Sequence, residues 1–252
     1  MELKELSHRV IAPYLEAQSL LTLFPLYVCR QRPSHKSWAV YHKRTMQGSI
    51  VTGKDCGIYP VDSYWLFART SEVAALLLHR IKETQGPDVK LSFPLEYLDL
   101  VSELFPERTI TIDRYYILLA SRFHERPLNQ TPVNLTKTVL KSLDIQPEMR
   151  AMLGSDDDFH EGIPFYGISI NGTLVSIGET LVDIGTIAAI QQIYTLPPYR
   201  GQGLALEIVS FLAGHLIRHH KMPTYLVSED NVASQNLARK IGFELYMRFG
   251  CL

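Results

Sequence analysis

The stretch Leu196-Pro197-Pro198-Tyr199-Arg200-Gly201-Gln202-Gly203-Leu204-Ala205 decides how this chain folds. Its prolines end the regular structure before them, and its glycines stand directly before a segment in which apolar residues recur at helical spacing. These apolar residues are Leu204, Ile208, Leu212 and Leu216. The pattern predicts a helix that begins at the glycines. A glycine turn at a helix N-terminus directs backbone N–H groups and the positive end of the helix dipole at one point, so this turn is a candidate phosphate site.

Two other phosphate-binding motifs do not fit this stretch. The dinucleotide fingerprint needs a third glycine, but Glu207 follows Leu206. A Walker loop needs Gly-Lys-Ser/Thr after its glycines, and that run is missing here. An ordinary turn between a strand and a helix, without a ligand, is the remaining alternative.

Strand-forming residues precede the glycine turn. Phe165 to Ile170 and Thr173 to Ile177 flank Asn171-Gly172, the two-residue signal of a type I′ hairpin. After a second turn at Asp183-Ile184-Gly185, the β-branched and apolar run Thr186 to Thr195 predicts a third strand. The three strands are therefore expected to form an antiparallel meander.

Beyond the predicted helix, strands and helices are expected to alternate. Thr224 to Ser228 predicts a short strand, Asn231 to Ile241 a helix that ends before Gly242, and Phe243 to Phe249 a half-buried final strand.

These residues carry a family resemblance. Tyr199 to Ala205 resembles the Arg/Gln-x-x-Gly-x-Gly/Ala acyl-CoA loop of the GNAT acyltransferase superfamily, and Ile193 to Pro197 resembles the strand exit before that loop. Asn231 to Ser234, continuing to Lys240-Ile241-Gly242-Phe243-Glu244, resembles the second signature of the same family. The similarity runs from about Phe165 to the C-terminus and is closest to the two-domain, glycine N-acyltransferase-like branch. It implies an α/β fold of mixed α+β character with a mixed sheet.

The resemblance also implies how an acyl-CoA is held. The backbone N–H groups from Arg200 to Ala205 would surround the CoA pyrophosphate, and the backbone of Ile193 to Thr195 would pair with the pantetheine arm. The thioester would enter a gap where the third and fourth strands splay apart, and Asn231 would contact the arm near the thiol. The expected cofactor-binding residues are Ile193, Tyr194, Thr195, Arg200, Gly201, Gln202, Gly203, Leu204, Ala205, Asn231 and Ser234. Acetyl-CoA or another acyl-CoA is the expected co-substrate, and no metal is expected.

One departure from the family pattern concerns the departing thiolate. Family members often place a tyrosine that protonates this thiolate seven residues after the signature asparagine, where this chain has Ala238. Ser234, one turn after Asn231, Tyr246 on the last strand, or a water molecule are the alternatives for this role.

A second departure concerns the general base. Many members use a glutamate on the strand before the loop, but Gln191 and Gln192 stand there, and glutamine accepts no proton at neutral pH. Glu179, on the neighbouring strand, is the nearest carboxylate that could deprotonate an amine. An exposed strand glutamate without a catalytic role is the alternative for Glu179.

The N-terminal half repeats the same order of elements. After a helix over Leu6 to Leu23, the patterns predict three strands, a helix, a strand, a helix and a strand. Their ranges are Trp38 to Met46, Gly48 to Gly53, Ser63 to Ala68, Val73 to Thr84, Val89 to Phe93, Pro94 to Phe105 and Thr109 to Ser121. Ala68-Arg69-Thr70-Ser71 stands in place of the glycine loop, so this half is not expected to bind CoA.

The chain is therefore predicted to hold tandem GNAT-like halves. Residues 1–126 form a degenerate N-terminal domain, and residues 127–252 form the complete domain with the acyl-CoA loop; they join in the polar, proline-containing segment Glu125 to Pro132. A chain that begins near Val133 is expected to lose turnover of the acceptor even if it folds well enough to keep CoA.

Composition excludes several classes of protein. The 25 Lys and Arg residues balance 26 Asp and Glu residues, which leaves no excess charge to attract nucleic acid or an anionic membrane. Cys29, Cys56 and Cys251 form no spaced pair, which favours a reducing compartment. The apolar run Leu20 to Cys29 is neither a signal peptide nor a membrane span, so the cytoplasm is the expected location.

Two clusters of potential metal ligands are interpreted as ordinary surface groups. Asp156-Asp157-Asp158, followed by His160 and Glu161, has no interspersed ligand pattern and is expected to be a solvated loop. His215 and His219 have helical spacing, but no glutamate completes a zinc motif between them.

The sequence thus predicts an acyl-CoA-dependent N-acyltransferase, with acetyl transfer as the expected reaction, that acts on a small-molecule primary amine by direct attack. The protein would be a monomer or a homodimer. A non-catalytic acyl-CoA-binding or sensing module is the chief alternative, and a nucleotide-binding domain that prefers ATP or NAD is another. The identity of the amine and the length of the acyl chain stay open.

Overall fold

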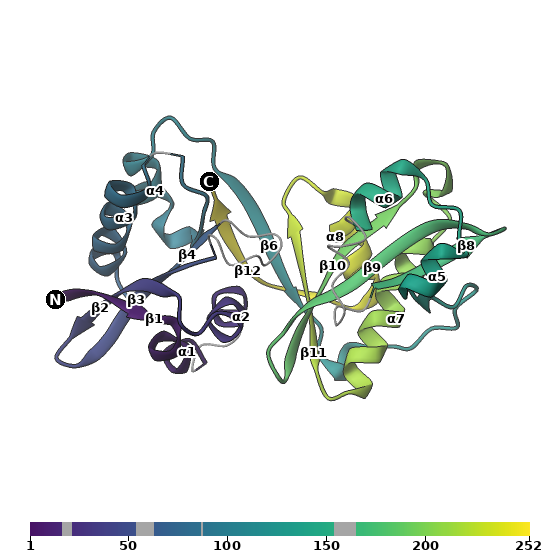
Figure 1. Cartoon of the computed structure of the whole chain (residues 1–252), viewed down its shortest axis with the longest axis horizontal. Coiled ribbons are helices and arrows are strands. Elements are labelled where there is room, and N and C mark those ends of the chain that lie inside the picture. The colour runs from purple at the N-terminus through teal and green to yellow at the C-terminus, as the bar shows by residue number, and fades with distance from the viewer. Residues whose placement is uncertain (17–21, 54–62, 87, 154–164) are drawn as a thin grey trace. The chain divides into compact units, whose positions relative to one another are not determined.

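The computed structural model describes residues 1–16, 22–53, 63–86, 88–153 and 165–252 of the chain (Figure 1). The chain forms two compact units, one of residues 1–114 with 247–252 and one of residues 115–246. These units differ from the linear domains 1–126 and 127–252, because the last strand of each sequence half passes from one unit into the other. Strand β6 (Thr111–Ile117) begins in the first unit and ends in the second, and β12 (Glu244–Cys251) runs the opposite way.

The second unit contains the glycine turn. Its elements, besides the parts of β6 and β12, are β7 (Val133–Asn134), α5 (Lys137–Lys141), α6 (Pro147–Leu153), β8 (Phe165–Ile170), β9 (Thr173–Asp183), β10 (Ile187–Thr195), α7 (Leu204–Arg218), β11 (Met222–Ser228) and α8 (Val232–Ile241). The strands lie in the order β6-β11-β10-β9-β8-β7. The pairs β8–β9 and β9–β10 are antiparallel, whereas β10–β11 is parallel. The predicted meander and the alternation that follows it are confirmed.

The β8–β9 hairpin has the predicted turn. Ile170 pairs with Thr173, and the two residues between them, Asn171 and Gly172, have φ angles of 51° and 83°. Positive φ at both central positions defines the type I′ turn, whose twist matches that of the flanking strands.

Helix α7 packs closely on the sheet of this unit. Leu204, Ile208, Leu212 and Leu216 are all buried, as their spacing predicts. Gly178 on β9 makes the approach possible, since a Cβ at this position would lie 2.5 Å from side-chain atoms of Ile193 and Ile208. The helix therefore covers the face of the sheet to which Gly178 belongs.

The first unit has the same succession of elements. It contains β1 (Glu2–Ser7), α1 (His8–Glu16), α2 (Leu23–Gln31), β2 (Lys36–His42), β3 (Thr45–Thr52), β4 (Tyr64–Ala68), α3 (Ser71–Gln85), β5 (Leu91–Pro94) and α4 (Leu98–Leu104), with the strand order β1-β2-β3-β4-β5-β12. Strands β2, β3 and β4 form an antiparallel meander, and β4 pairs in parallel with β5 after the crossover helix α3. The predicted tandem α/β architecture with mixed sheets is confirmed.

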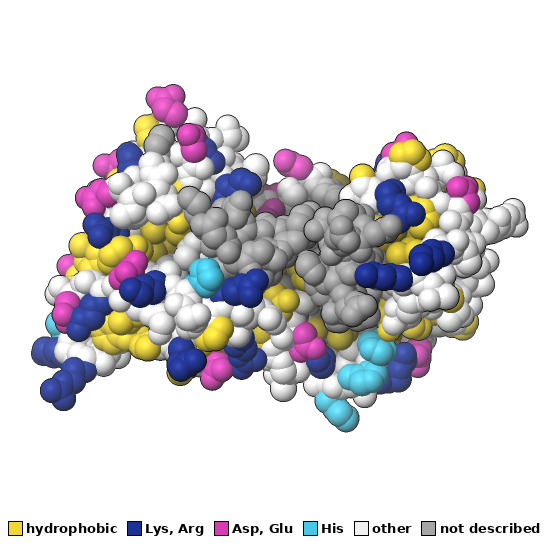
Figure 2. Space-filling view, viewed as in Figure 1, with side chains coloured by type: hydrophobic (Ala, Val, Ile, Leu, Met, Phe, Trp, Pro, Cys, Tyr) yellow, Lys and Arg dark blue, Asp and Glu magenta, His cyan; other side chains and the backbone are white. Residues whose placement is uncertain are grey.

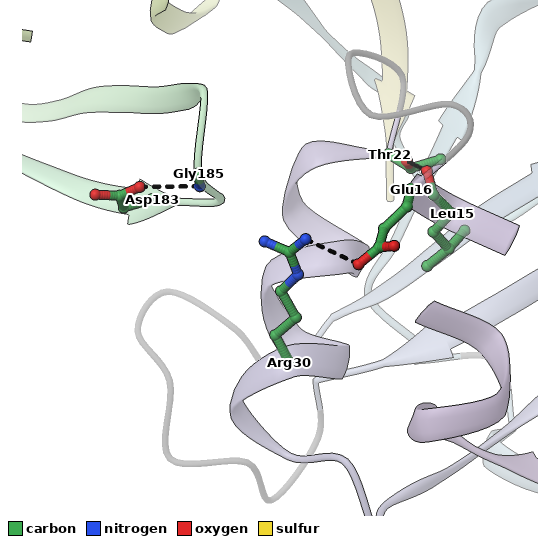
Figure 3. A network of polar contacts seen from close by, with 6 residues as sticks. All are labelled: Leu15, Glu16, Thr22, Arg30, Asp183 and Gly185. Carbon is green, nitrogen blue, oxygen red and sulfur yellow. Dashed lines mark hydrogen bonds and ion pairs between the residues drawn. The ribbon is translucent and has the colours of Figure 1, made fainter. Parts of the chain in front are cut away.

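Two local predictions for this unit are wrong. The first residues do not form one helix over Leu6 to Leu23: β1 pairs with β2 up to Ser7, and separate helices follow, with residues 17–21 outside the described part. Two contacts join the helices (Figure 3): Thr22 Oγ1 donates to the Leu15 carbonyl at 2.7 Å, and Arg30 pairs with Glu16 at 2.8 Å.

The first hairpin of this unit turns earlier than predicted. Lys43 and Arg44 adopt φ angles of 45° and 68°, so β2 ends at His42 rather than at Met46. Tertiary pairing holds these two residues in a conformation that their side chains do not by themselves favour.

The end of β6 belongs to the second unit, so we expect a chain that lacks β6 to fold less well than the full chain. Tyr116 and Leu118 belong to the buried core of the second unit, and the Leu118 N–H donates to the Pro223 carbonyl at 2.9 Å. A chain that begins at Val133 lacks the strand beside β11, so we expect it not to fold cooperatively. Thermal denaturation followed by circular dichroism should show a cooperative transition for residues 111–252 and none for residues 133–252. A cooperative transition in the shorter chain would contradict this prediction.

A helix that crosses a membrane must be long and apolar. No helix in the described part of the chain is both long and apolar enough to cross a bilayer.

Candidate active site

The glycine turn has backbone angles that favour glycine. Strand β10 ends at Thr195, and a short 3₁₀ turn over Pro197–Tyr199 leads to Gly201 and Gly203, whose φ angles are 77° and 85°. A Cβ built on either glycine has no atom within 4 Å. Backbone conformation, rather than crowding by protein atoms, therefore favours glycine here, and the space over the turn is open.

The N-terminus of α7 presents a row of unused donors. Among the described residues, no protein group accepts the backbone N–H groups of residues 201–206, and no side chain caps the helix. The first helical bond at this end runs from the Glu207 N–H to the Gly203 carbonyl at 3.1 Å. Six amide donors without a partner among the described residues thus lie at the positive end of the helix dipole, an arrangement that suits a diphosphate.

Two charged side chains flank the turn. The exposed Arg200 donates from Nε to the Thr195 carbonyl at 3.0 Å, and its guanidinium lies 5.8 Å from the centre of the Tyr194 ring. Glu207 accepts hydrogen bonds from the backbone N–H groups of Asn129 and Gln130 at 3.1 and 3.0 Å. The positive group is thereby held beside the turn, while the negative charge is partly compensated by amides of the connecting segment.

Strands β10 and β11 separate next to this turn. They pair with each other from Ile187–Met222 to Ile190–Tyr225, and within the described part of the chain they do not pair with each other beyond these residues, although β10 stays paired with β9. A bulge in β10 lies just beyond, between the pairs Gln191–Glu179 and Tyr194–Ile177, where Gln192 has a φ angle of 52°. The structure therefore contains the gap that the resemblance implies, and it begins four residues before the end of β10.

Glu179 lies on the face of the sheet opposite α7. Successive strand residues point to opposite faces, and Gly178 faces the helix. The cross-strand partners of Glu179, which share its face, are Phe165 and Gln191. Its side chain is buried at 3% exposure, so the interpretation as an exposed strand glutamate is wrong.

The Glu179 carboxylate is an unpaired buried acid. No residue in the described ranges hydrogen-bonds to it or forms an ion pair with it. Burial raises the pKa of Glu179 to about 7, because the charged form loses hydration. A carboxylate with such a pKa accepts and releases protons near neutral pH, as a general base must.

The second signature builds the first turn of α8. The Asn231 side-chain carbonyl accepts the Ser234 N–H at 3.0 Å and so caps the helix, which leaves the Asn231 amide donors for another partner. The Ser234 hydroxyl lies 2.7 Å from the hydroxyl of Tyr225 on β11. Sequence reasoning did not single out Tyr225, since only the packing of α8 on β11 brings it to Ser234.

Ala238 and Tyr246 lie apart from this pair. Ala238 is completely buried in the core of the unit, so a tyrosine there would have to displace its neighbours. Tyr246 is 40% exposed, and its ring lies 6.1 Å from that of Tyr115. No recorded contact in the described part of the chain joins Tyr246 to Glu179 or Ser234.

The equivalent turn of the first unit has a side-chain cap at its helix N-terminus. Thr70 Oγ1 accepts the Val73 N–H at 3.3 Å and caps α3, and the Arg69 N–H donates to the Gln47 carbonyl at 3.0 Å. Two backbone donors at this turn are thus already bonded within the protein. We expect calorimetry to measure one acetyl-CoA per chain, and a stoichiometry of two would contradict this prediction.

Potential metal ligands do not gather at the site. Within the described ranges, no three His, Cys, Asp or Glu side chains are placed to hold an ion. Asp156-Asp157-Asp158, His160, Glu161 and Cys56 lie outside those ranges. The His215 and His219 rings lie 4.3 Å apart along α7.

The chain is similar to known proteins both in the sequence around the candidate site and in its fold. Residues 135–243 match the family model described as the acetyltransferase (GNAT) family. No curated protein matches the chain. Among solved structures, a GNAT-family acetyltransferase from Colwellia psychrerythraea is similar with 15% identity and a TM-score of 0.60, covering 100% of this chain and 98% of that one.

Two further structures are similar over nearly their whole length. A GCN5-related N-acetyltransferase from Sphaerobacter thermophilus has 11% identity and a TM-score of 0.62, covering 99% of this chain and 94% of that one. A tandem GNAT protein from the clavulanic acid biosynthesis pathway has 13% identity and a TM-score of 0.59, with 99% and 97% covered. At these identities the likeness concerns the fold, and it extends over both units. The family match shows that residues 135–243 form a GNAT acetyltransferase family domain.

Proposed function

We propose that this protein is an acyl-CoA-dependent N-acyltransferase that transfers an acetyl group from acetyl-CoA to a small-molecule primary amine by direct attack. We further propose that it belongs to the two-domain, glycine N-acyltransferase-like branch. The observation that carries the proposal is the open row of amide donors at α7 beside the gap between β10 and β11, with Glu179 on the adjacent strand β9.

The residues around the gap fit an acyl-CoA. The amides of residues 201–206 and Arg200 would hold the pyrophosphate, and the backbone from Ile193 to Thr195, on the edge of β10 that no longer pairs with β11, would bond to the pantetheine amides. The free amide donors of Asn231 would contact the arm near its thiol. No covalent acyl-enzyme is needed if both reactants meet at the gap.

The two candidate proton groups lie on opposite faces of the sheet. Thr180 lies two residues after Gly178 on β9 and therefore points to the same face, the one that α7 covers, and so does its cross-strand partner Ile190. Tyr225 pairs with Ile190 and also points to this face. Its contact with Ser234 places Ser234 on the α7 face. Glu179 points to the other face. The thioester would enter the gap from one face and the amine from the other. Glu179 would take the amine proton, while a backbone N–H near Ile193 would polarise the carbonyl.

Charge and location are part of the proposal. Lys and Arg side chains are interspersed with Asp and Glu over the face drawn in Figure 2, in line with a net charge of -1. We place the protein in the cytoplasm, as a monomer or homodimer without a nucleic acid partner.

The proposal is tested with acetyl-CoA and a panel of small primary amines, followed by release of free thiol. We expect amine-dependent thiol release, and none with tertiary amines that cannot be acylated stably. Tight acetyl-CoA binding without turnover by any amine would instead indicate a non-catalytic acyl-CoA-binding module. Preference for ATP or NAD over CoA would indicate a nucleotide-binding domain.

A further inference from the structure

Tyr225 occupies the point where the sheet opens. It pairs with Ile190 in the last recorded pair between β10 and β11. Its side chain is buried at 3% exposure, and its ring lies 5.8 Å from that of Phe243. Its hydroxyl extends to Ser234 Oγ at 2.7 Å. A fixed phenol thus contacts the first turn of α8 beside the gap.

The chemistry of the two hydroxyls favours one direction for their hydrogen bond. A phenol is a stronger acid than an aliphatic alcohol and is therefore the better donor. Burial raises the pKa of Tyr225, an effect that the hydrogen bond with Ser234 offsets only in part, so the phenol keeps its proton at neutral pH. When Tyr225 donates to Ser234 Oγ, the hydrogen of Ser234 must point to another acceptor.

Two contacts fix the position of Ser234. Its backbone N–H is held by Asn231 Oδ1, and its hydroxyl is held by Tyr225. Ala238, one turn later on the same face of α8, carries no polar group. The phenol that reaches this face therefore comes from β11.

We propose that Tyr225 is a positioning residue that directs the Ser234 hydroxyl toward the gap, where Ser234 donates a hydrogen bond to the departing CoA sulfur. This inference rests on the proposed N-acyltransferase function. As the amine nitrogen bonds to the carbonyl carbon, the C–S bond breaks and its electron pair goes to sulfur, while the ammonium proton goes to Glu179. CoA leaves as a thiolate that takes a proton from water after release. Neither hydroxyl changes its protonation, so no buried phenolate forms.

The first test measures the bound thiol and needs no acceptor. The pKa of the CoA thiol is titrated in complex with the full-length protein through the ultraviolet absorbance of the thiolate. We expect this pKa to rise by about one unit in both Ser234→Ala and Tyr225→Phe, the scale of one hydrogen bond to a charged group. Tyr116→Phe is the matched control, because Tyr116 is a buried tyrosine of the same unit whose hydroxyl has no partner among the described residues. An unchanged thiol pKa in Tyr225→Phe would overturn the inference.

The second test separates positioning from packing. With acetyl-CoA and an amine that the parent protein acetylates, Tyr225→Phe should lower kcat about tenfold and leave the KM for acetyl-CoA nearly unchanged. The double variant should be no slower than Ser234→Ala alone, because Tyr225 acts through Ser234. Additive losses, or a Tyr225→Phe variant as fast as the parent, would overturn the inference while the proposed function stands. A parent that binds acetyl-CoA and acetylates no amine would overturn both.

Discussion

Gly203→Asp is expected to abolish acetyl-CoA binding while the chain remains folded. The substitution puts a non-glycine residue at a φ angle of 85° and a negative charge among the free amides at the N-terminus of α7. A loss of at least about 100-fold in affinity, or ~2.8 kcal/mol, is expected in calorimetry. Circular dichroism should show an unchanged fold, because the ideal Cβ at this position meets no protein atom within 4 Å.

A control variant separates strain from loss of the anion site. Gly172 has a φ angle of 83° and equally open surroundings, and it lies in the hairpin turn of the same unit. Gly172→Asp introduces the same strain and the same charge, and it should bind acetyl-CoA like the parent. If Gly203→Asp also bound like the parent, the α7 terminus would not be the CoA site.

Glu179→Gln should slow acyl transfer by about 10²- to 10⁴-fold, the usual contribution of a positioned general base. Glutamine keeps the shape of the side chain but cannot take the proton of the amine. Acetyl-CoA binding should not change, since Glu179 lies on the face opposite α7. Steady-state kinetics and calorimetry on the same sample check both expectations. Full activity in this variant would remove Glu179 from the mechanism.

The pH dependence of the parent should reveal the same group. Glu179 acts as a base only when ionised, so the rate should fall as the pH drops through about 7, the value to which burial raises the pKa of Glu179. In Glu179→Gln this acidic limb should disappear.

Glu179→Gln is expected to lower activity, but it should raise the stability of the fold at alkaline pH. The folded-state pKa of Glu179 is raised from 4.5 to about 7, so its contribution to stability is full below pH 4.5 and is lost as the pH rises through 7. Above that pH the buried charge destabilises the fold. Glu179→Gln should therefore raise the free energy of unfolding by up to about 3 kcal/mol at pH 8, and by almost nothing at pH 4. Denaturant titrations at the two pH values measure the difference, and equal effects at both would contradict it.

Much of the candidate site can be predicted from the sequence, because several of its features are local. Glycines at positive φ, a hairpin turn at Asn171-Gly172 and the apolar spacing of α7 are local properties, and neighbouring residues determine them. The sequence makes Glu179 a candidate because it is the nearest carboxylate on the strand beside Gln191 and Gln192, but its burial and its raised pKa depend on residues far along the chain. Tyr225 carried no signal, since its partner Ser234 belongs to the next helix.

The sequence by itself determined the order of elements beyond the first helices, the tandem repetition and the turn that opens α7, because periodicity, turn residues and capping act over a few positions. Tertiary structure alone decided where the last strand of each half goes, how far β10 and β11 stay paired, and which hydroxyls meet at the gap. These features depend on hydrogen bonds between distant strands and on side chains from different elements packing together. A periodic pattern within one segment does not determine such contacts between distant segments.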